Sequence, residues 1–416
     1  MTPPRRNHLR DLRGIGRVAV DATLGVVDLV EALHTRIART PVRLSGPVGR
    51  AVHEVTGHVY RTVRGVAGAV GGGLDAVLGR LVPLVGDVPD TPAREALVAA
   101  LNGVLGDYLA DSANPLAIGM RLRRDGAGLD LERDALAARI PRPASTILVA
   151  VHGLCMNDRQ WARAGHDHAA ALARDLGASA VYLHYNSGRH VSDNGREFAA
   201  LLEALVEAWP VPPTRLIVVG HSMGGLVARS AAHHGTLAGH RWRGLLGSLV
   251  FLGVPHHGSP LERGGQGLHL LLEALPYAAP FARLGRVRSA GITDLRHGSV
   301  LDDDWRGRDR FSRRPVVRHP LPLPVDVNAY AVAATLADRV RGDGRGMRGD
   351  GLVPVASALG LHADPRLALA FPASHRWIAT STGHLDLLSS TAVCDRVREW
   401  LAESKRVRGT PRGRPN

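Results

Sequence analysis

The stretch Arg215–Arg229, RLIVVGHSMGGLVAR, decides which fold the sequence predicts. Its first part, Leu216–Val219, is a short apolar run rich in β-branched residues, which is typical of a strand buried on both faces. The pentapeptide GHSMG that follows fits the pattern G-x-S-x-G. After it, Leu226, Val227 and Ala231 recur at helical spacing. Strand, sharp turn and helix in this order are the context in which this motif exposes a nucleophilic serine.

Ser222 stands at the centre of that predicted turn. Glycines two residues before and after it, Gly220 and Gly224, let neighbouring backbone pass close to a strained turn. The hydroxyl is then expected at the end of a strand and the start of a helix, where unpaired N–H groups favour negative charge. The alternative is a glycine-rich turn with an incidental serine. The flanking strand and helix favour the nucleophile.

The composition indicates a globular protein with an unusual charge. The chain has 416 residues, 45% of them hydrophobic and 22% charged, which suffices for one large domain and an appendage. The net charge of +14 and a pI near 11 raise the alternatives of nucleic acid or an anionic membrane as partners. The positive charge is nearly all arginine and is spread along the chain, so we expect no nucleic-acid partner.

The cysteine content and the hydropathy of the chain indicate the cellular compartment in which the protein is expected. The two cysteines, Cys155 and Cys394, make no disulfide framework, which favours a reducing compartment. No secretory signal peptide is evident, and no run approaches the roughly 18 apolar residues of a membrane-spanning helix. We therefore expect a cytoplasmic protein, with peripheral attachment to a lipid surface as an alternative.

The sequence texture divides the chain into three parts. Apolar residues at helical spacing over 18–37, 48–66 and 73–82 predict a helical N-terminal extension, residues 1–113. These helices are expected to be unstable on their own, so they need a surface to pack against. The rest of the protein is the favoured surface, with another copy or lipid as alternatives. The oligomeric state stays open. Residues 404–416 form a basic tail that is predicted to be disordered.

Residues 114–403 alternate between predicted strands and helices, which implies a mostly parallel central sheet flanked by helices. Helices are expected at 169–176 and, capped by Ser192 and Asp193, at about 196–208. The gap at about 256–324 is too long for a simple connection and predicts a lid. Besides Leu216–Val219, the expected strands are Ile118–Leu122, Leu129–Leu131, Thr146–Val151, Ala180–Tyr185, Ser248–Val254, Asp326–Ala334 and Trp377–Ala379.

A serine nucleophile needs a base and a group that orients the base, and both are sought downstream of Ser222. Asp350, in the loop Gly349–Pro354 after a predicted strand, is the best acid. The alternatives are Asp326, Asp338 and Asp343. His384, in a loop ahead of the last helix, is the best base, with His375 and His362 as alternatives. Asp386 is expected to begin a helix rather than join the triad.

The tetrahedral intermediate of acyl transfer needs two backbone donors. The N–H of Met223, directly after the nucleophile, is one, and the N–H of Leu154, in the loop that begins His152-Gly153, is the other. Cys155 beside this loop is expected to be a packing residue. His221 is interpreted as a spacer in the turn, not as the base.

No metal or cofactor is expected. The pairs His233-His234 and His256-His257 lack partners at metal-ligand spacing. The three consecutive aspartates Asp302–Asp304 lack the spaced oxygen ligands of a calcium loop, so a solvated turn is preferred.

Five segments together resemble one superfamily: GHSMGGLVAR, LVAVHGL, FLGVPHHGSP, the DGLVP loop and TGHLDLL. They are similar to the lipase/esterase branch of the α/β-hydrolases, closest to PGAP1-like (GPI inositol-deacylase-like) and triacylglycerol-lipase-like bacterial proteins. The resemblance covers about residues 114–401 and implies carboxylic-ester hydrolysis of lipid-like substrates, no cofactor and a mobile lid. The single glycine of the oxyanion loop departs from the HGGG pattern and is often found with medium to long acyl chains.

Two other classes of function compete with an esterase or lipase. A thioesterase, amidase, polyester depolymerase or acyltransferase would use the same triad on the same fold. A non-catalytic lipid-binding or scaffold protein would keep the fold without the chemistry. All the expected triad and oxyanion residues are present, which favours the enzyme.

Overall fold

The structure is a computed structural model, and it describes residues 92–259, 289–308, 318–340, 342 and 347–409. The chain divides into two compact units, and the description below concerns the one made of Pro92–Ala110 and Ala117–Asn416. The predicted N-terminal helices at 18–37, 48–66 and 73–82 and much of the predicted lid lie outside the described residues. The division into three parts therefore stays a prediction.

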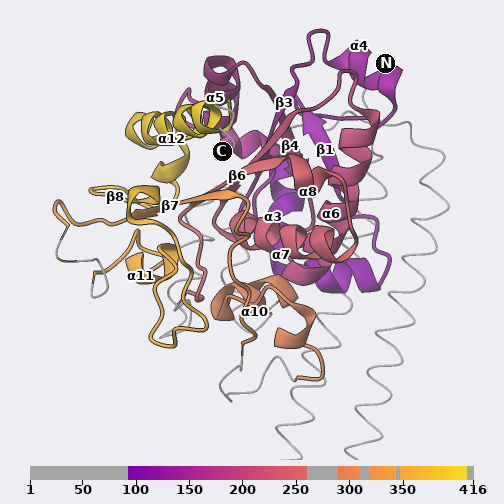
Figure 1. The fold of residues 1–416 in the computed structure, drawn as a ribbon. Coiled ribbons are helices and arrows are strands. Elements are labelled where there is room, and N and C mark those ends of the chain that lie inside the picture. The colour runs from indigo at the N-terminus through magenta and orange to yellow at the C-terminus, as the bar shows by residue number, and fades with distance from the viewer. Residues whose placement is uncertain (1–91, 260–288, 309–317, 341, 343–346, 410–416) are drawn as a thin grey trace, which may run out of the picture. The chain divides into compact units, whose positions relative to one another are not determined.

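An eight-stranded sheet forms the centre of this unit (Figure 1). Neighbouring strands follow the order β2-β1-β4-β3-β5-β6-β7-β8. All pairs from β4 to β8 are parallel, and only β1 is antiparallel to both its neighbours. The strands are β1 Arg121–Arg124, β2 Ala127–Gly128, β3 Thr146–Val151, β4 Ser179–His184, β5 Arg215–His221, β6 Leu246–Leu252, β7 Asn328–Ala334 and β8 Arg376–Ala379.

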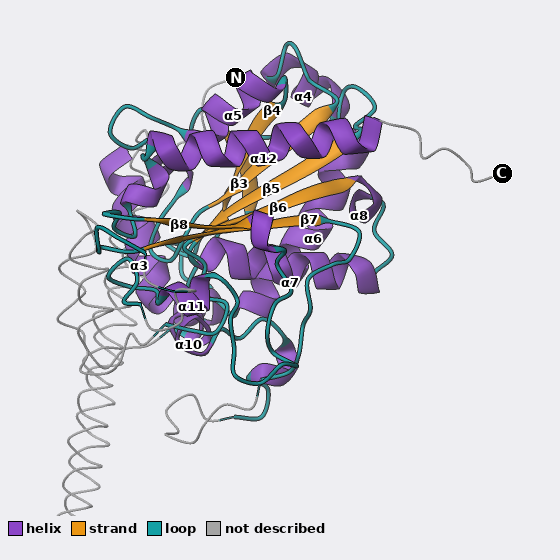
Figure 2. Ribbon diagram, turned by 60° about the vertical axis from the view of Figure 1, so that its left-hand side comes forward, coloured by secondary structure: helices purple, strands orange, loops and turns teal. Residues whose placement is uncertain are grey.

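The central strands are apolar because helices cover both faces of the sheet. Every residue of β5 and of β6 is buried, which is the pattern that a parallel strand inside an α/β fold requires. Helices α5 and α12 pack on one face, whereas α6, α7 and α8 pack on the other (Figure 2). The α-helices are α3 Pro92–Asp111, α4 Arg133–Arg139, α5 His168–Leu176, α6 Val191–Ala208, α7 Met223–Leu237, α8 Trp242–Leu245, α10 Ala290–His297, α11 Val355–Ala358 and α12 Thr391–Gly409.

Helix α6 begins at Val191, five residues before the predicted start near Arg196. Ser192 and Asp193, predicted to cap this helix, lie inside its first turn. The cap comes instead from a distant carboxylate: Asp294 of α10 accepts a hydrogen bond from the Val191 N–H at 2.8 Å. The predicted start of α6 was therefore wrong, because the helix is capped by a residue more than a hundred positions away and not by the local capping candidates.

Helix α3 belongs to the same compact unit as the sheet, although the sequence analysis placed its residues in the N-terminal extension. Its glycines allow close backbone approach: a Cβ added to Gly103 would lie 2.2 Å from the Cys155 Sγ. The buried amide of Asn102 accepts a hydrogen bond from the Ile118 N–H at 2.9 Å. Glycine and asparagine weaken the apolar period, which is why the sequence did not reveal this packing.

A buried ion cluster joins α3 to the first strand. Arg123 of β1 donates to Glu95 of α3 at 2.6 Å and to Asp158 at 2.9 Å. All three side chains are at most 10% exposed, so their charges need partners within the protein, and Glu95 also pairs with Arg159 at 2.5 Å.

Two further predictions concern the C-terminal tail and membrane-spanning helices. Helix α12 continues to Gly409, whereas the disordered tail was predicted from residue 404. Among the described residues, no helix combines the length and apolarity needed to cross a membrane.

Candidate active site

Ser222 forms the link between β5 and α7, and its backbone is strained. Its φ of 53° and ψ of −125° lie where non-glycine residues are rare. The strain is held by a hydrogen bond from the Ser222 N–H to the Leu252 carbonyl at the end of β6, 2.9 Å long. The flanking glycines are needed, because a Cβ on Gly224 would lie 2.2 Å from the Val151 carbonyl oxygen. The turn thus has the backbone that the predicted serine motif requires.

Asp350 and His384 form a buried pair. The His384 Nδ1 lies 2.8 Å from the Asp350 Oδ2, and both side chains are at most 4% exposed. The His384 N–H also donates to the Asp350 carbonyl at 3.1 Å. The second carboxylate oxygen, Oδ1, accepts hydrogen bonds from the N–H groups of Leu352 and Val353 at 3.0 and 2.8 Å. The carboxylate is therefore fixed on both sides, with one oxygen left for the imidazole.

This pair lies beside the turn that carries Ser222. Asp350 follows β7 and His384 follows β8, and parallel strands bring such loops to one edge of the sheet. Gly253, directly after β6, lies against both side chains of the pair. A Cβ added there would lie 3.2 Å from the Asp350 Oδ2 and 3.3 Å from the His384 Cε1. The residue before Gly253, Leu252, is the one whose carbonyl holds the Ser222 N–H.

His221 gives a second connection between the turn and the His384 loop. Its Nε2 lies 3.1 Å from the His384 carbonyl oxygen, and the two ring centroids are 4.8 Å apart. Complete burial lowers the pKa of His221 well below its usual range, so the ring is neutral and its Nε2–H donates this bond. The sequence analysis interpreted His221 only as a spacer. No local pattern reveals the contact, because 163 residues separate the partners.

The loop after β3 lies against the serine. A Cβ added to Gly153 would come within 3.1 Å of the Ser222 Cβ. Leu154 and Met223 are buried, and within the described part of the chain neither of their N–H groups forms a hydrogen bond. Both residues belong to segments that adjoin Ser222, and their role as oxyanion donors stays a prediction.

Neighbouring groups hold that loop in place. The Tyr185 hydroxyl donates to the His152 carbonyl at 2.8 Å, and the Cys155 N–H donates to the Ser187 Oγ at 3.0 Å. Cys155 has a positive φ of 61°, and burial raises the pKa of its thiol to about 12. A thiol that stays protonated at neutral pH is a poor nucleophile, which agrees with the packing role predicted for it.

The alternative acids and bases lie in other settings. Asp326 is 63% exposed and is paired with Arg243, while Asp338 is 84% exposed. Asp343 lies outside the described residues. The His375 Nδ1 contacts the Ala329 carbonyl, and the His362 Nδ1 accepts from the Asp364 N–H. Asp386 begins the short helix Asp386–Leu388, as expected.

The triple aspartate is not the solvated turn that the sequence suggested. Asp304 is 1% exposed, and its Oδ2 accepts hydrogen bonds from the N–H groups of Val300 and Leu301 at 2.9 and 3.1 Å. Its Oδ1 accepts from the N–H of His319. Asp304 is therefore an internal acceptor for three backbone N–H groups, and it shapes the segment after α10.

Part of the chain is similar to a known domain family. Residues 144–318 match the PGAP1-like alpha/beta domain, and this range includes Ser222, Leu154 and Met223 but not Asp350 or His384. No curated protein matches the chain significantly by sequence.

The chain is similar to several solved structures at low sequence identity. A Bacillus licheniformis lipase is 18% identical, with 62% of this chain and 93% of that chain covered and a TM-score of 0.39. A Pyrococcus furiosus esterase is 12% identical, with 64% and 81% covered and a TM-score of 0.37. A thioesterase of the prodiginine pathway in Streptomyces coelicolor is 17% identical, with 68% and 96% covered and a TM-score of 0.34.

The domain match and the mostly parallel eight-stranded sheet agree with the motifs found in the sequence. Together they give this chain an α/β-hydrolase fold in which residues 144–318 are similar to the PGAP1-like alpha/beta domain.

Proposed function

We propose that this protein is a serine hydrolase that cleaves carboxylic esters with lipid-like acyl groups. The observation that carries the proposal is the buried Asp350–His384 pair, 2.8 Å between Oδ2 and Nδ1, beside the strained turn of Ser222. Nucleophile, orienting acid and base follow one another as Ser222, Asp350 and His384, which is the chain order of α/β-hydrolases.

In the proposed reaction Ser222 Oγ attacks the ester carbonyl carbon while the His384 Nε2 takes the serine proton. Asp350 holds the imidazole by its Nδ1–H and stabilises the imidazolium. His384 then gives the proton to the leaving alcohol oxygen, and the carbon–oxygen bond breaks to leave an acyl-serine. Water attacks this acyl-enzyme with His384 as base, and the carboxylic acid leaves.

The negative oxygen of each tetrahedral intermediate would lie against the N–H groups of Leu154 and Met223. Both donors are free of other hydrogen bonds within the described chain. Met223 begins α7, so the helix dipole adds to the favourable potential. One such donor contributes about 3–4 kcal/mol to transition-state stabilisation. No cofactor takes part in this scheme.

Hydrolysis of a p-nitrophenyl ester series from short to long acyl chains tests the proposal. Ser222→Ala and His384→Ala are expected to lose at least about 10⁴-fold in kcat, because the nucleophile and the base act as one unit. Ser230→Ala is the matched control: Ser230 is a buried serine on the same helix, and its hydroxyl has no hydrogen-bond partner in the described structure. It should keep the native rate.

The lipid-like substrate is tested in the same assay. A rate that rises toward medium and long acyl chains supports it, whereas a short-chain optimum reduces the proposal to a simple esterase. No turnover of any ester by folded protein, together with no labelling of Ser222 by a fluorophosphonate, would favour the lipid-binding or scaffold alternative. Labelling without ester turnover would favour a thioesterase, amidase or acyltransferase.

A further inference from the structure

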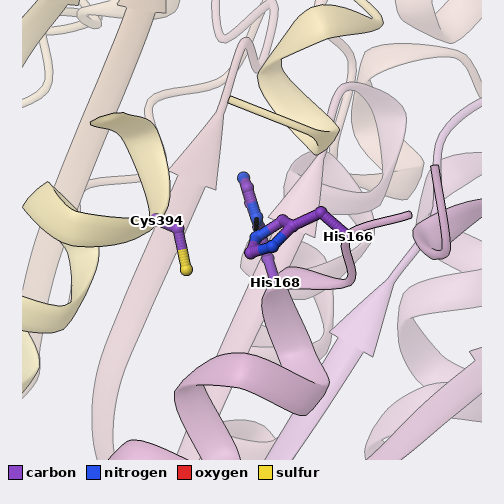
Figure 3. A group of neighbouring side chains, drawn as sticks. All are labelled: His166, His168 and Cys394. Carbon is purple, nitrogen blue, oxygen red and sulfur yellow. Dashed lines mark hydrogen bonds between the residues drawn. The ribbon is translucent and has the colours of Figure 1, made fainter. Parts of the chain in front are cut away.

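Three potential metal ligands that are not members of the proposed triad meet in the fold: His166, His168 and Cys394 (Figure 3). One ligand atom of each, an imidazole nitrogen or the sulfur, lies within 4.8 Å of the other two. More than two hundred residues separate Cys394 from the histidines. The sequence analysis considered only adjacent histidine pairs, and this cluster was therefore missed.

The protein backbone holds the two histidines in fixed positions. Arg163 and His166 exchange backbone hydrogen bonds of 2.8 and 2.9 Å across a tight turn whose central residues, Ala164 and Gly165, both have positive φ. Asp167 caps α5 through the Ala170 N–H and also accepts from the Tyr182 hydroxyl. His168 is the first residue of α5 and is 1% exposed.

The hydrogen bonds of His168 define which of its nitrogens can bind an ion. Its Nε2 lies 2.8 Å from the Leu387 carbonyl oxygen, so this nitrogen carries the proton and donates. The lone pair is then on Nδ1, which faces the His166 Nε2 at 2.7 Å. A metal-binding histidine commonly donates its other N–H to a backbone carbonyl in this way.

Cys394 supplies a third ligand from the opposite element. It lies in the first turn of α12, is 6% exposed, and its side chain faces the two imidazole rings (Figure 3). Two imidazole nitrogens and a thiolate are a soft donor set that suits zinc and disfavours calcium or magnesium. His166 is half-buried, which leaves a side of the cluster open to solvent.

We propose that His166, His168 and Cys394 bind one zinc ion, with water as the fourth ligand on the open side. Zinc–nitrogen and zinc–sulfur bonds of about 2.0–2.3 Å place two tetrahedral nitrogens about 3.3 Å apart and a nitrogen and a sulfur about 3.6 Å apart. The two nitrogens, now 2.7 Å apart, would separate by about 0.6 Å, and the sulfur would move in by up to about 1.2 Å. On binding, the thiol proton of Cys394 is released to solvent and His166 moves its proton from Nε2 to Nδ1, so that the ion takes the place of the hydrogen bond between the two rings.

The site would join the turn before α5 to α12 and, through the Leu387 carbonyl, to the loop that carries His384. Leu387 is three residues beyond His384. Zinc is therefore expected to stabilise this loop without taking part in the reaction. The binding of the ion does not depend on the proposed hydrolase function.

Metal content and cobalt spectra test the site directly. The full chain, purified without a polyhistidine tag and stripped with a chelator, is equilibrated with zinc and freed of excess ion. We expect about one zinc per chain and a rise in Tm of about 5 °C at a zinc concentration a hundred times the Kd. Cobalt(II) should give tetrahedral d–d bands and a thiolate-to-cobalt charge-transfer band.

Variants assign the ligands. Cys394→Ser should lose the charge-transfer band, and His166→Gln, which alters a half-buried residue, should weaken zinc binding at least about tenfold. His233→Gln, a half-buried histidine outside the cluster, is the matched control and should bind as the native chain does. Substoichiometric zinc in the native chain would overturn the proposal. So would cobalt binding without a thiolate band, or equal affinity in native chain and His166→Gln.

Discussion

The substitution Asp350→Asn tests the proposed catalytic relay most sharply, because the structure dictates how the new amide must lie. The N–H groups of Leu352 and Val353 both point at Oδ1. In the variant only the amide oxygen can accept from them, so it takes the place of Oδ1. The NH₂ group then occupies the place of Oδ2, 2.8 Å from the His384 Nδ1, and donates to it.

That arrangement puts the wrong tautomer on His384. With Nδ1 accepting, the imidazole proton moves to Nε2, and this nitrogen can no longer take the proton of Ser222. A substitution of this kind in a serine triad lowers kcat by about 10⁴, which corresponds to about 5.4 kcal/mol of activation free energy. The hydrogen bonds to the backbone are kept, so the free energy of unfolding should change by less than about 1 kcal/mol.

Two further variants separate chemistry from folding. Asp350→Ala leaves two buried N–H groups without an acceptor and should lower the free energy of unfolding by about 1–3 kcal/mol for each. Asp386→Asn makes the same chemical change on the exposed carboxylate that accepts from the Gly383 N–H, and it should keep the native kcat.

The measurements are kcat on the best p-nitrophenyl ester and unfolding in urea. An Asp350→Asn protein that is as stable as the native chain and keeps more than about a tenth of its kcat would refute the relay. A loss of activity that only follows a loss of folded protein would refute the tautomer argument.

Three other outcomes follow from the structure. Gly253→Ala should lower kcat at least about tenfold in the same ester assay. Gly253 has a φ of 57°, which strains any other residue, and the new methyl group would lie 3.2 Å from the Asp350 Oδ2 and 2.6 Å from the Leu387 Cδ1. Arg123→Met should lower the free energy of unfolding in urea by about 3–5 kcal/mol, because it removes the guanidinium that pairs with the buried Asp158 and leaves the buried Glu95 with Arg159 alone. Burial lowers the pKa of His152 to about 3, so below about pH 6.5 the unfolded chain binds a proton that the folded chain does not. This one group should cost about 2 kcal/mol of stability at pH 5, and a Tm that does not fall between pH 7 and pH 5 would contradict it.

Local patterns were sufficient for the central parallel strands and for the sharp turn at Ser222, whereas the expected strand Leu129–Leu131 was wrong, since β2 is Ala127–Gly128. Strands β3 and β5 were predicted because a buried parallel strand is a short run of apolar residues, and such a run is visible in consecutive positions of the sequence. The strained turn at Ser222 could be predicted because such a turn needs glycines at fixed spacing. The chain order of the superfamily then selected Asp350 and His384 from many acids and histidines, and the structure brings these two within 2.8 Å.

Local patterns did not predict how α3 packs or where α6 begins. The packing of α3 uses glycines and a buried asparagine, which carry no apolar period. The first turn of α6 is capped by Asp294, about a hundred residues away in sequence. Asp304 was misread for the same reason, since burial of a carboxylate depends on the backbone folded around it.

The sequence alone therefore determined the order of the elements, the sharp turn and the set of candidate groups, because these depend on residues within a few positions of one another. Only the tertiary structure decided which groups meet. It paired Asp350 with His384, placed His221 against the His384 carbonyl, and gathered His166, His168 and Cys394 at one point. Contacts between distant residues are set by how strands are ordered and helices are packed across the sheet, and no periodicity in the chain encodes them.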